Sequence, residues 1–394
     1  MSIHKIKPSA RSGKVEEPLV SRDCGPAGCE VDWLTSRRLE AEDDIGSFTD
    51  FSLEQGWGDG LPLIPPTDAR VRAFLSENDR YPDEVIARMP DSSECTVEKI
   101  VINAVMAGAP SRSLELIIAA IEAITEPDFE LYGVNATTAS VYPGFVVNGP
   151  VRDALDIPYS YGCAGGVATK ANAIARAIRL IMRNVAGQVA GVTSQTTFGS
   201  PGRVAGLLMG EWEEKSPWAP LALRRAGVKG NAITAFSTMG TMNILDTTST
   251  GAMAFLKMIG KSVSYAGANC YSPSMEFSEM TIGINPICAE IVAKEIPNIE
   301  DVQEVIWKSA AVDADWLEPL HRAQLDAQGR IRQDGRIYAT PEPKDMVLFV
   351  CGGLGGLHAL GLHSFGSSLS QTKRIAAAIS GPEAHAADHN SASA

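Results

Sequence analysis

The sequence predicts an α/β protein: a layered mixed sheet with flanking helices, arranged as two similar halves. Short apolar runs such as 145–147 and 346–350 alternate with longer stretches whose apolar residues recur at helical spacing. Small polar residues, among them Asn135 and Asn148, lie where strand signals stop. Such positions commonly form small-molecule sites in α/β proteins. The second half of the chain repeats this alternation of strand and helix signals, although no repeat of fixed period is present.

The composition excludes several classes of protein. A net charge of −13 argues against nucleic acid as the main partner, because phosphate contacts need clustered Lys and Arg. No apolar run approaches 18 residues, so we expect no membrane span. The basic segment 1–14 lacks the apolar core of a secretory signal. Seven cysteines in 394 residues do not resemble a disulfide framework, so we expect a cytoplasmic protein with reduced thiols.

The chain is expected to contain an N-terminal arm, one α/β domain and a short tail. Residues 1–45 lack periodicity and form an arm that is either disordered or wrapped around a neighbour. Cys24 and Cys29 in this arm are two free thiols on a turn, or else a redox pair or half a metal site. The α/β domain spans 46–380, with 46–225 and 226–380 as its possible lobes. Residues 381–394 are small and polar, which is typical of disorder.

A glycine- and proline-rich stretch, 56–67, predicts an extended path with turns before the first helices of the domain. Thr67 is expected to cap the helix that follows. Asp59 either closes an Asx-turn or orients a substrate or partner chain. Core helices are predicted at 96–107 and 113–124.

The central stretch contains the strongest site signal. A strand at 145–147 ends at Asn148, and the glycine-rich loop 161–166 leads into a helix at 170–185 with Thr169 as its expected N-cap. Free N–H groups at such a helix start favour an anion, and Lys170 adds positive charge. The alternative is a tightly turned loop packed on its own sheet. Arginines line the helix face opposite the apolar one, where we expect solvent or a subunit contact: Arg176, Arg179 and Arg183.

Residues 191–221 form a long polar loop, and such loops often carry function. Gln195 and Arg203 are candidate ligand contacts. Trp212 and Trp218 are equally good anchors for a subunit interface, because aromatic residues concentrate there. We therefore expect a homodimer or a larger homo-oligomer.

In the second half, strands are predicted at 232–237, 280–284 and 346–350. Asn285, followed by proline, is a standard N-cap and needs no catalytic explanation. The last strand enters a glycine-rich stretch that fits neither the dinucleotide nor the Walker pattern. What remains is a backbone that another group approaches closely, with His358 and His363 just beyond it.

The segments that resemble a known family extend over roughly residues 50–370. They are Gly56-Trp57-x-Asp59-Gly60-Leu61-Pro62, Pro65-Pro66-Thr67, Asn103-Ala104-Val105-Met106-Ala107-Gly108, Ala136-Thr137-Thr138, Val147-Asn148-Gly149-Pro150, Ala171-Asn172-Ala173, Ser216-Pro217-Trp218-x-Pro220-Leu221 and the glycine-rich stretch up to His358.

In these segments the chain resembles a family of bacterial proteins, the large α/β partners of "UGSC" thiol or selenol proteins. The resemblance implies a small partner protein carrying a Sec/Cys-Gly-Ser-Cys motif. This chain has no such motif and no CxxC. Thiol chemistry of that kind would need a second chain, or Cys163 or Cys351 acting alone.

We interpret the protein as an enzyme, or the substrate-binding subunit of one, acting on a small polar or anionic molecule in a lyase, hydrolase or reductive cleavage reaction. His358 is the candidate general acid/base, because imidazole titrates near neutrality. Cys163 is the candidate nucleophile, because a thiol before a helix start has its thiolate favoured. Asp59 is the third candidate catalytic residue. The candidate substrate-binding residues are Asn135, Asn148, Gly165, Gly166, Lys170, Asn172, Gln195 and Arg203.

The alternative function is a non-catalytic scaffold for a small thiol- or selenol-containing redox protein. No spacing typical of a metal site supports a bound metal, although Asp59, Glu276, His358 and His363 are residue types that ligate metals. The sequence indicates no particular cofactor.

Overall fold

Two four-stranded mixed sheets form the centre of the α/β domain. The computed structural model describes residues 34–275 and 279–376. The chain divides into two units, Met1–Thr35 and Ser36–Ala394, and the fold described below is that of the second unit. The first sheet has the order β12-β5-β3-β4, formed by Gln371–Arg374, Ala232–Thr238, Tyr142–Asn148 and Leu207–Gly210. The second has the order β10-β7-β11-β6, formed by Met346–Val350, Met280–Ile284, His358–His363 and Met242–Leu245.

The two sheets have the same connectivity. In the first, β3 pairs parallel with β4 and antiparallel with β5. In the second, β7 pairs parallel with β10 and antiparallel with β11. The fourth strand of each sheet is exchanged: β6 follows β5 in the chain but pairs with β11, whereas β12 follows β11 but pairs with β5. The predicted α/β class is confirmed, and the two halves are interlocked through their last strands.

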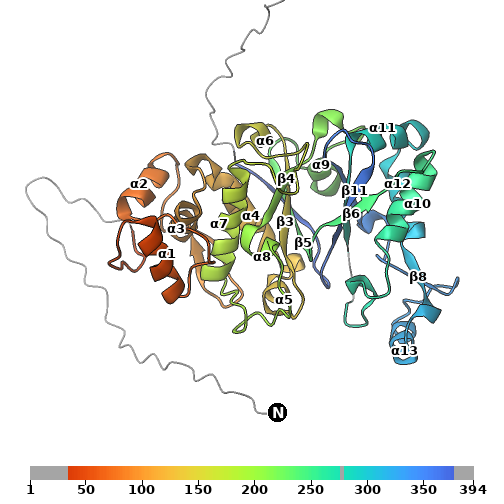
Figure 1. Ribbon diagram of the computed structural model, residues 1–394, viewed down its shortest axis with the longest axis horizontal. Helices are drawn as coiled ribbons and strands as arrows, with labels where there is room; N and C mark the ends of the chain where they lie inside the picture. The colour runs from red at the N-terminus through yellow and green to blue at the C-terminus, as the bar shows by residue number, and fades with distance from the viewer. Residues whose placement is uncertain (1–33, 276–278, 377–394) are drawn as a thin grey trace, which may run out of the picture. The chain divides into compact units, whose positions relative to one another are not determined.

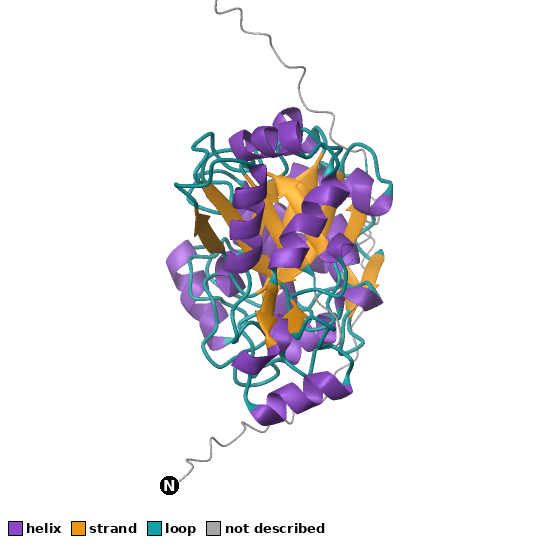
Figure 2. Cartoon of the chain, turned by 90° about the vertical axis from the view of Figure 1, so that its right-hand side faces the viewer, coloured by secondary structure: helices purple, strands orange, loops and turns teal. Residues whose placement is uncertain are grey.

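Helices cover the outer face of each sheet, and the inner faces pack on each other (Figure 1). The helices α4 (Leu114–Ile124) and α7 (Ala171–Asn184) pack on the first sheet, with α3 (Val97–Ala107) beside α7. The helices α10 (Ala252–Ser262), α11 (Pro286–Glu295) and α12 (Ile299–Ser309) pack on the second. Figure 2, viewed from that side, shows helices in front of the strands.

Strand β10 shows why its sequence is apolar throughout. Leu348 and Val350 pack with the helices of the second sheet, whereas Val347 and Phe349 pack between the two sheets. Because successive side chains of a strand point to opposite faces, a strand covered on both sides is apolar at every position.

Smaller elements surround this centre. The helices are α1 (Ile45–Glu54), α2 (Asp68–Ser76), α5 (Leu131–Ala136), α6 (Val151–Ala154), α8 (Gly202–Ala205), α9 (Leu221–Ala226) and α13 (Pro319–Ala327). The remaining strands are β1 (Val85–Arg88), β2 (Glu94–Thr96), β8 (Ala311–Asp313) and β9 (Arg336–Tyr338). Within the described residues, no helix is long and apolar enough to cross a membrane.

Two helices begin where the sequence predicts an N-cap residue. Thr67 accepts the Arg70 N–H at the start of α2. Asn285 accepts the Cys288 N–H at the start of α11, so both predicted N-caps are confirmed. At α7 the helix begins one residue later than Thr169 would require, and the Thr169 hydroxyl accepts the Ala171 N–H at 3.3 Å.

Candidate functional site

The carboxyl ends of β3 and β4 lie side by side because these strands are parallel. Asn148 is the last residue of β3, and Glu211 follows the last residue of β4. The Glu211 N–H donates to the Val147 carbonyl at 3.0 Å, which extends the ladder by one bond beyond the strand.

The ends of β7 and β10 repeat this geometry in the second sheet. Asn285 follows β7, Cys351 follows β10, and the Cys351 N–H donates to the Ile284 carbonyl at 3.0 Å. The Trp212 N–H then donates to the Val350 carbonyl at 2.7 Å, linking the end of β4 to the end of β10. The polar ends of both parallel pairs are therefore joined at one place between the sheets.

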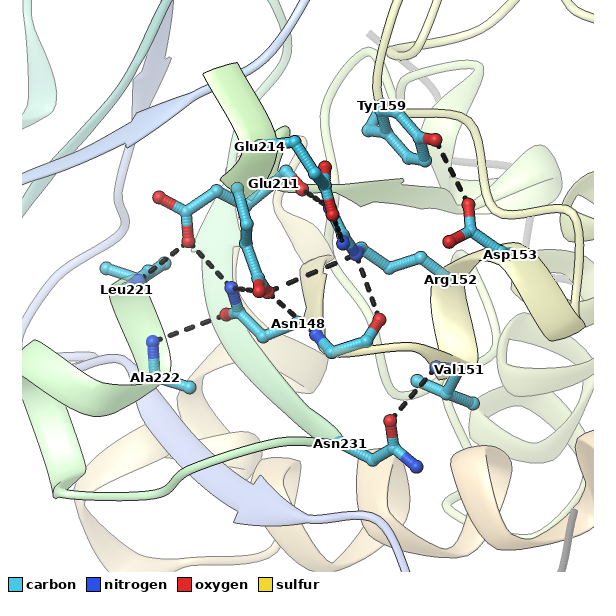
Figure 3. Close-up of polar contacts among 12 residues, drawn as sticks. Asn148, Val151, Arg152, Asp153, Tyr159, Glu211, Glu214, Leu221, Ala222 and Asn231 are labelled. Atoms are coloured by element: carbon cyan, nitrogen blue, oxygen red, sulfur yellow. Dashed lines mark hydrogen bonds and ion pairs between the residues drawn. The ribbon is translucent and has the colours of Figure 1, made fainter. Parts of the chain in front are cut away.

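Asn148 is held by protein contacts on all sides (Figure 3). Its Nδ2 donates to Glu211 Oε2 at 2.7 Å and to Glu213 Oε1 at 2.8 Å. Its Oδ1 accepts the Ala222 N–H at 3.3 Å, and the side chain is buried. The Asn148 side chain thus connects the ends of β3 and β4 with α9, and its predicted contact with substrate would require these bonds to open.

Glu211 is a fully buried carboxyl group at the centre of this network (Figure 3). Its Oε2 also accepts the Leu221 N–H at 2.6 Å, whereas its Oε1 is buried without a partner. Burial raises the pKa of Glu211 above its ordinary value, because the charged form has lost its water.

Arg152 closes the same network from α6. Its side chain is 2% exposed, donates to the Gly149 carbonyl at 2.9 Å and pairs with Glu214 at 2.5 Å. The guanidinium also lies over the Tyr159 ring, 4.9 Å from its centroid. The sequence offered no sign of this role, because a single arginine after Pro150 looks like any surface residue.

A pair of thiols lies next to the buried carboxyl. Cys163, from the glycine-rich loop after α6, and Cys351 are both buried in the same cluster between the two sheets. Interaction with the Cys351 side chain lowers the pKa of the Cys163 thiol, and the N–H groups around its sulfur, including those of Gly352 and Ala164, lower it further. Interaction with Cys163, together with burial and the nearby Glu211, raises the pKa of Cys351 well above its ordinary value. Cys163 therefore loses its proton more readily than Cys351.

Glycines allow the two loops to approach. The Gly352 N–H donates to the Tyr159 carbonyl at 2.9 Å. The Tyr161 ring lies so close to Gly353 that a Cβ there would be 2.3 Å from it, and a Cβ on Gly283 would be 2.8 Å from the Cys351 sulfur. The close backbone approach predicted for the stretch after β10 is to the loop that contains Cys163.

The rest of the predicted anion loop is exposed. Gly165 and Gly166 have φ of +134° and +100°, which favour glycine, and a Cβ on either would meet open space. Lys170 is exposed, and Asn172 donates to the Val167 carbonyl at 2.9 Å. Their roles in binding an anion remain predictions.

The two histidines of β11, His358 and His363, differ in burial. His358 is exposed at the start of β11, and its carbonyl accepts the Asn285 amide at 2.5 Å. Its part as general acid/base remains a prediction. His363 is buried against the Tyr265 ring, and burial lowers its pKa to about 4, which keeps it neutral at pH 7.

Asp59 lies away from the strand ends and is held by α7. Its carboxylate accepts two bonds from Arg176, at 2.7 and 2.8 Å, and also the Leu61 N–H at 3.1 Å. This geometry includes the Asx-turn that was one of its two interpretations. Asn135 lies in the short helix α5 rather than at a strand end, and donates to the Ala186 carbonyl at 3.1 Å.

The two loop tryptophans pack within their own chain. Trp212 contacts the Tyr159 ring with centroids 5.7 Å apart, and Trp218 donates to the Pro297 carbonyl at 3.0 Å. Both side chains are half-buried, and their part in a subunit interface remains a prediction.

Gln195 is exposed, whereas Arg203 lines a cavity of about 230 Å³ beside α7. Arg179 lines the same cavity and is buried, which corrects the expectation that the arginines of this helix face solvent or a neighbouring subunit. The loop before β4 covers that face of the helix, which periodicity alone does not reveal.

In the parts of the chain that the structure describes, no three His, Cys, Asp or Glu side chains are grouped so as to hold a metal ion. Residues 1–33 of the predicted arm, with Cys24 and Cys29, lie outside the described residues, as do the predicted tail and Glu276. Compared with known proteins, the chain matches no family model, and no curated protein is detectably similar to it.

Proposed function

We propose that the protein is a thiol-dependent enzyme that reductively cleaves a small molecule, with Cys163 as the attacking thiolate and Cys351 as the second thiol. One observation carries this proposal: two buried thiols lie in the same cluster between the sheets, and their surroundings lower the pKa of Cys163 while they raise that of Cys351. Burial of both side chains limits the substrate to a small molecule or a narrow extended group.

The simplest substrate class for this pair is a small disulfide. The Cys163 thiolate attacks one sulfur of the substrate, the substrate S–S bond breaks, and one half leaves as a thiolate. Cys351 then gives up its proton to that thiolate and attacks the Cys163 sulfur. The second half of the substrate leaves, and a Cys163–Cys351 disulfide remains. Two electrons have passed to the substrate, and an external dithiol returns the enzyme to its reduced form.

The geometry favours this reaction over hydrolysis or elimination. A hydrolytic cysteine needs a general base that is oriented against it. The side chain that most affects the Cys163 thiol is instead a second thiol, which suits thiol–disulfide exchange. His358 follows the Cys351 loop. That it protonates a leaving group remains a prediction.

The test uses the reduced full-length protein and hydroxyethyl disulfide as the small substrate, with intact-mass analysis of the products. The wild type should lose two hydrogens as the internal disulfide forms. Cys351→Ser keeps a hydroxyl donor beside Cys163 but lacks the second sulfur, so it should accumulate a mixed disulfide on Cys163. Cys163→Ser should not react at this site.

Cys288→Ser is the matched control, because Cys288 is also buried but donates to the Gly356 carbonyl rather than to a thiol. It should behave as the wild type does. A Cys163→Ser variant that reacts as fast as the wild type, or a wild type that never forms the internal disulfide, would show that the pair is only structural.

A further inference from the structure

A second feature of the domain is the cavity of about 230 Å³ between α7 and the loop 188–204. Three arginines line it: Arg179 and Arg183 from α7, and Arg203 from α8. In a chain with a net charge of −13, such a group of positive charges requires an explanation.

Arg179 is buried among neutral acceptors. Its Nε donates to the Arg203 carbonyl at 2.9 Å, its Nη1 contacts Met182 Sδ at 2.6 Å, and its Nη2 donates to Gln188 Oε1. Burial and the neighbouring Arg203 lower the pKa of Arg179 to about 9, because nothing nearby compensates the charge well. A guanidinium remains charged at pH 7 even so.

Arg183 and Arg203 each keep a buried donor without an acceptor. Arg183 donates to the Gly56 carbonyl at 3.2 Å, but its Nε has no partner. Arg203 donates to the Ser194 hydroxyl at 2.7 Å, but its Nη1 has no partner. Within residues 34–275 and 279–376, neither of them nor Arg179 has a carboxylate within ion-pair distance.

The acidic residue on the cavity wall does not neutralise these charges. It is Asp59, whose carboxylate is already held by a fourth arginine, Arg176, through bonds of 2.7 and 2.8 Å. Removing charges from water without a counter-charge is costly, and buried donors are normally satisfied. Arg179 is buried and Arg183 and Arg203 are half-buried, so the three arginines leave positive charge around the cavity that no carboxylate within ion-pair distance neutralises.

We propose that this cavity binds a small oxyanion with two or more negative charges, held by Arg183 and Arg203 with Arg179 behind them. Guanidinium groups match phosphate and carboxylate oxygens in paired, charge-assisted hydrogen bonds. The hydroxyl groups of Thr196 and Ser200 on the same wall add neutral donors. The site is separate from the thiol pair, and it uses arginine side chains rather than the exposed glycine loop around Lys170.

The binding test is calorimetric titration of the full-length protein with inorganic phosphate, and separately with malonate, at low ionic strength. Chloride at matched ionic strength is the reference for non-specific attraction. Saturable binding of phosphate identifies a phosphoryl group as the ligand chemistry, and saturable binding of malonate alone identifies a dicarboxylate. Binding of both anions no stronger than that of chloride would overturn the proposal.

Variants locate the site. Arg203→Met and Arg183→Met should each weaken binding at least about ten-fold, since each removes a charge-assisted hydrogen bond. Arg322→Gln, which removes an exposed arginine paired with Asp315, should leave the affinity unchanged. Lys170→Met should also leave it unchanged; if binding is lost in Lys170→Met but kept in Arg203→Met, the anion site is the glycine loop and this proposal fails.

A stability readout separates ligand binding from a structural role. If Arg203 serves a ligand, Arg203→Met should melt no lower than the wild type in anion-free buffer, because an uncompensated charge has been removed. It should also lose the rise in melting temperature that phosphate gives the wild type. A variant that melts lower than the wild type without anion, and still gains the same rise with it, would show that Arg203 is structural.

Discussion

The ends of β4 and β10 occupy equivalent positions in two sheets of the same connectivity, but they carry different chemistry. Glu211 and Cys351 each follow the parallel edge strand, and each N–H donates at 3.0 Å to a carbonyl near the end of the neighbouring strand, that of Val147 or Ile284. Asn148 and Asn285 are the corresponding residues on the central strands. At the first end the side chains bond to one another and to backbone N–H groups, with only Glu211 Oε1 left without a partner among the atoms of this network, whereas at the second end one thiol lies near another.

The difference follows from the connection after each strand. Between β4 and β5 the chain includes Glu213, Glu214 and helix α9, which supply acceptors and N–H groups to the first end. Between β10 and β11 it contains only residues 351–357, largely glycine, with few side chains to cover the strand end. The long connection after β4 therefore covers the end of that strand, whereas the short, glycine-rich connection after β10 leaves room for the loop that contains Cys163 to pack there.

The largest expected effect concerns the two asparagines. Asn148→Ala removes the donor to two carboxylates and the acceptor for the Ala222 N–H, so we expect it to lower the free energy of unfolding by about 3 kcal/mol. Asn285→Ala removes an N-cap and one bond to the His358 carbonyl, for a loss of about 1–2 kcal/mol. Urea unfolding measures both, and equal losses would show that the two ends contribute alike to stability.

The next effect concerns Glu211. Its pKa is raised in the folded protein, so above the ordinary value of 4.5 the folded state binds more protons than the unfolded state. The free energy of unfolding therefore falls as the pH rises through this range. Glu211→Gln does not titrate and keeps an acceptor for the Leu221 N–H. From pH 5 to pH 8 it should gain stability relative to the wild type by about 1 kcal/mol or more, since one pKa unit corresponds to about 1.4 kcal/mol.

The control for this measurement is Glu290→Gln, because Glu290 is an exposed carboxylate paired with Lys294 on α11. Its stability curve should run close to that of the wild type across the same pH range. If the Glu211→Gln curve also runs parallel to the wild type, Glu211 is charged in the folded protein and the first strand end is not a closed, desolvated network.

The smallest effect on stability, but a clear one on reactivity, concerns the thiols. Because the pKa of Cys163 is lowered and that of Cys351 is raised, iodoacetamide at pH 7 should modify Cys163 at least about ten-fold faster. Cys351→Ala removes the hydrogen-bond donor, so the pH profile of Cys163 alkylation should move to higher pH. Peptide mapping by mass spectrometry gives both rates, and an unmoved profile would mean that backbone N–H groups alone set the reactivity of Cys163.

The parts of the fold that depend on local sequence were predictable, and those that depend on long-range pairing were not. Thr67 and Asn285 cap their helices because a side-chain acceptor and the following residues suffice to start a helix. Cys163 was a candidate because of its place before a helix, but nothing local indicates that Cys351 is its neighbour. The same limit applies to Arg179, whose helical spacing suits an exposed face and whose burial depends on a later loop.

The exchange of the fourth strands has a consequence for synthesis on the ribosome. Strand β5 ends at Thr238, whereas its partner β12 begins only at Gln371. Until then one edge of β5 lacks its native partner, and unpaired edges are templates for wrong pairing. The nascent first sheet is thus open to misassembly with other chains while residues 239–370 are made, and it is completed only when β12 has been synthesised.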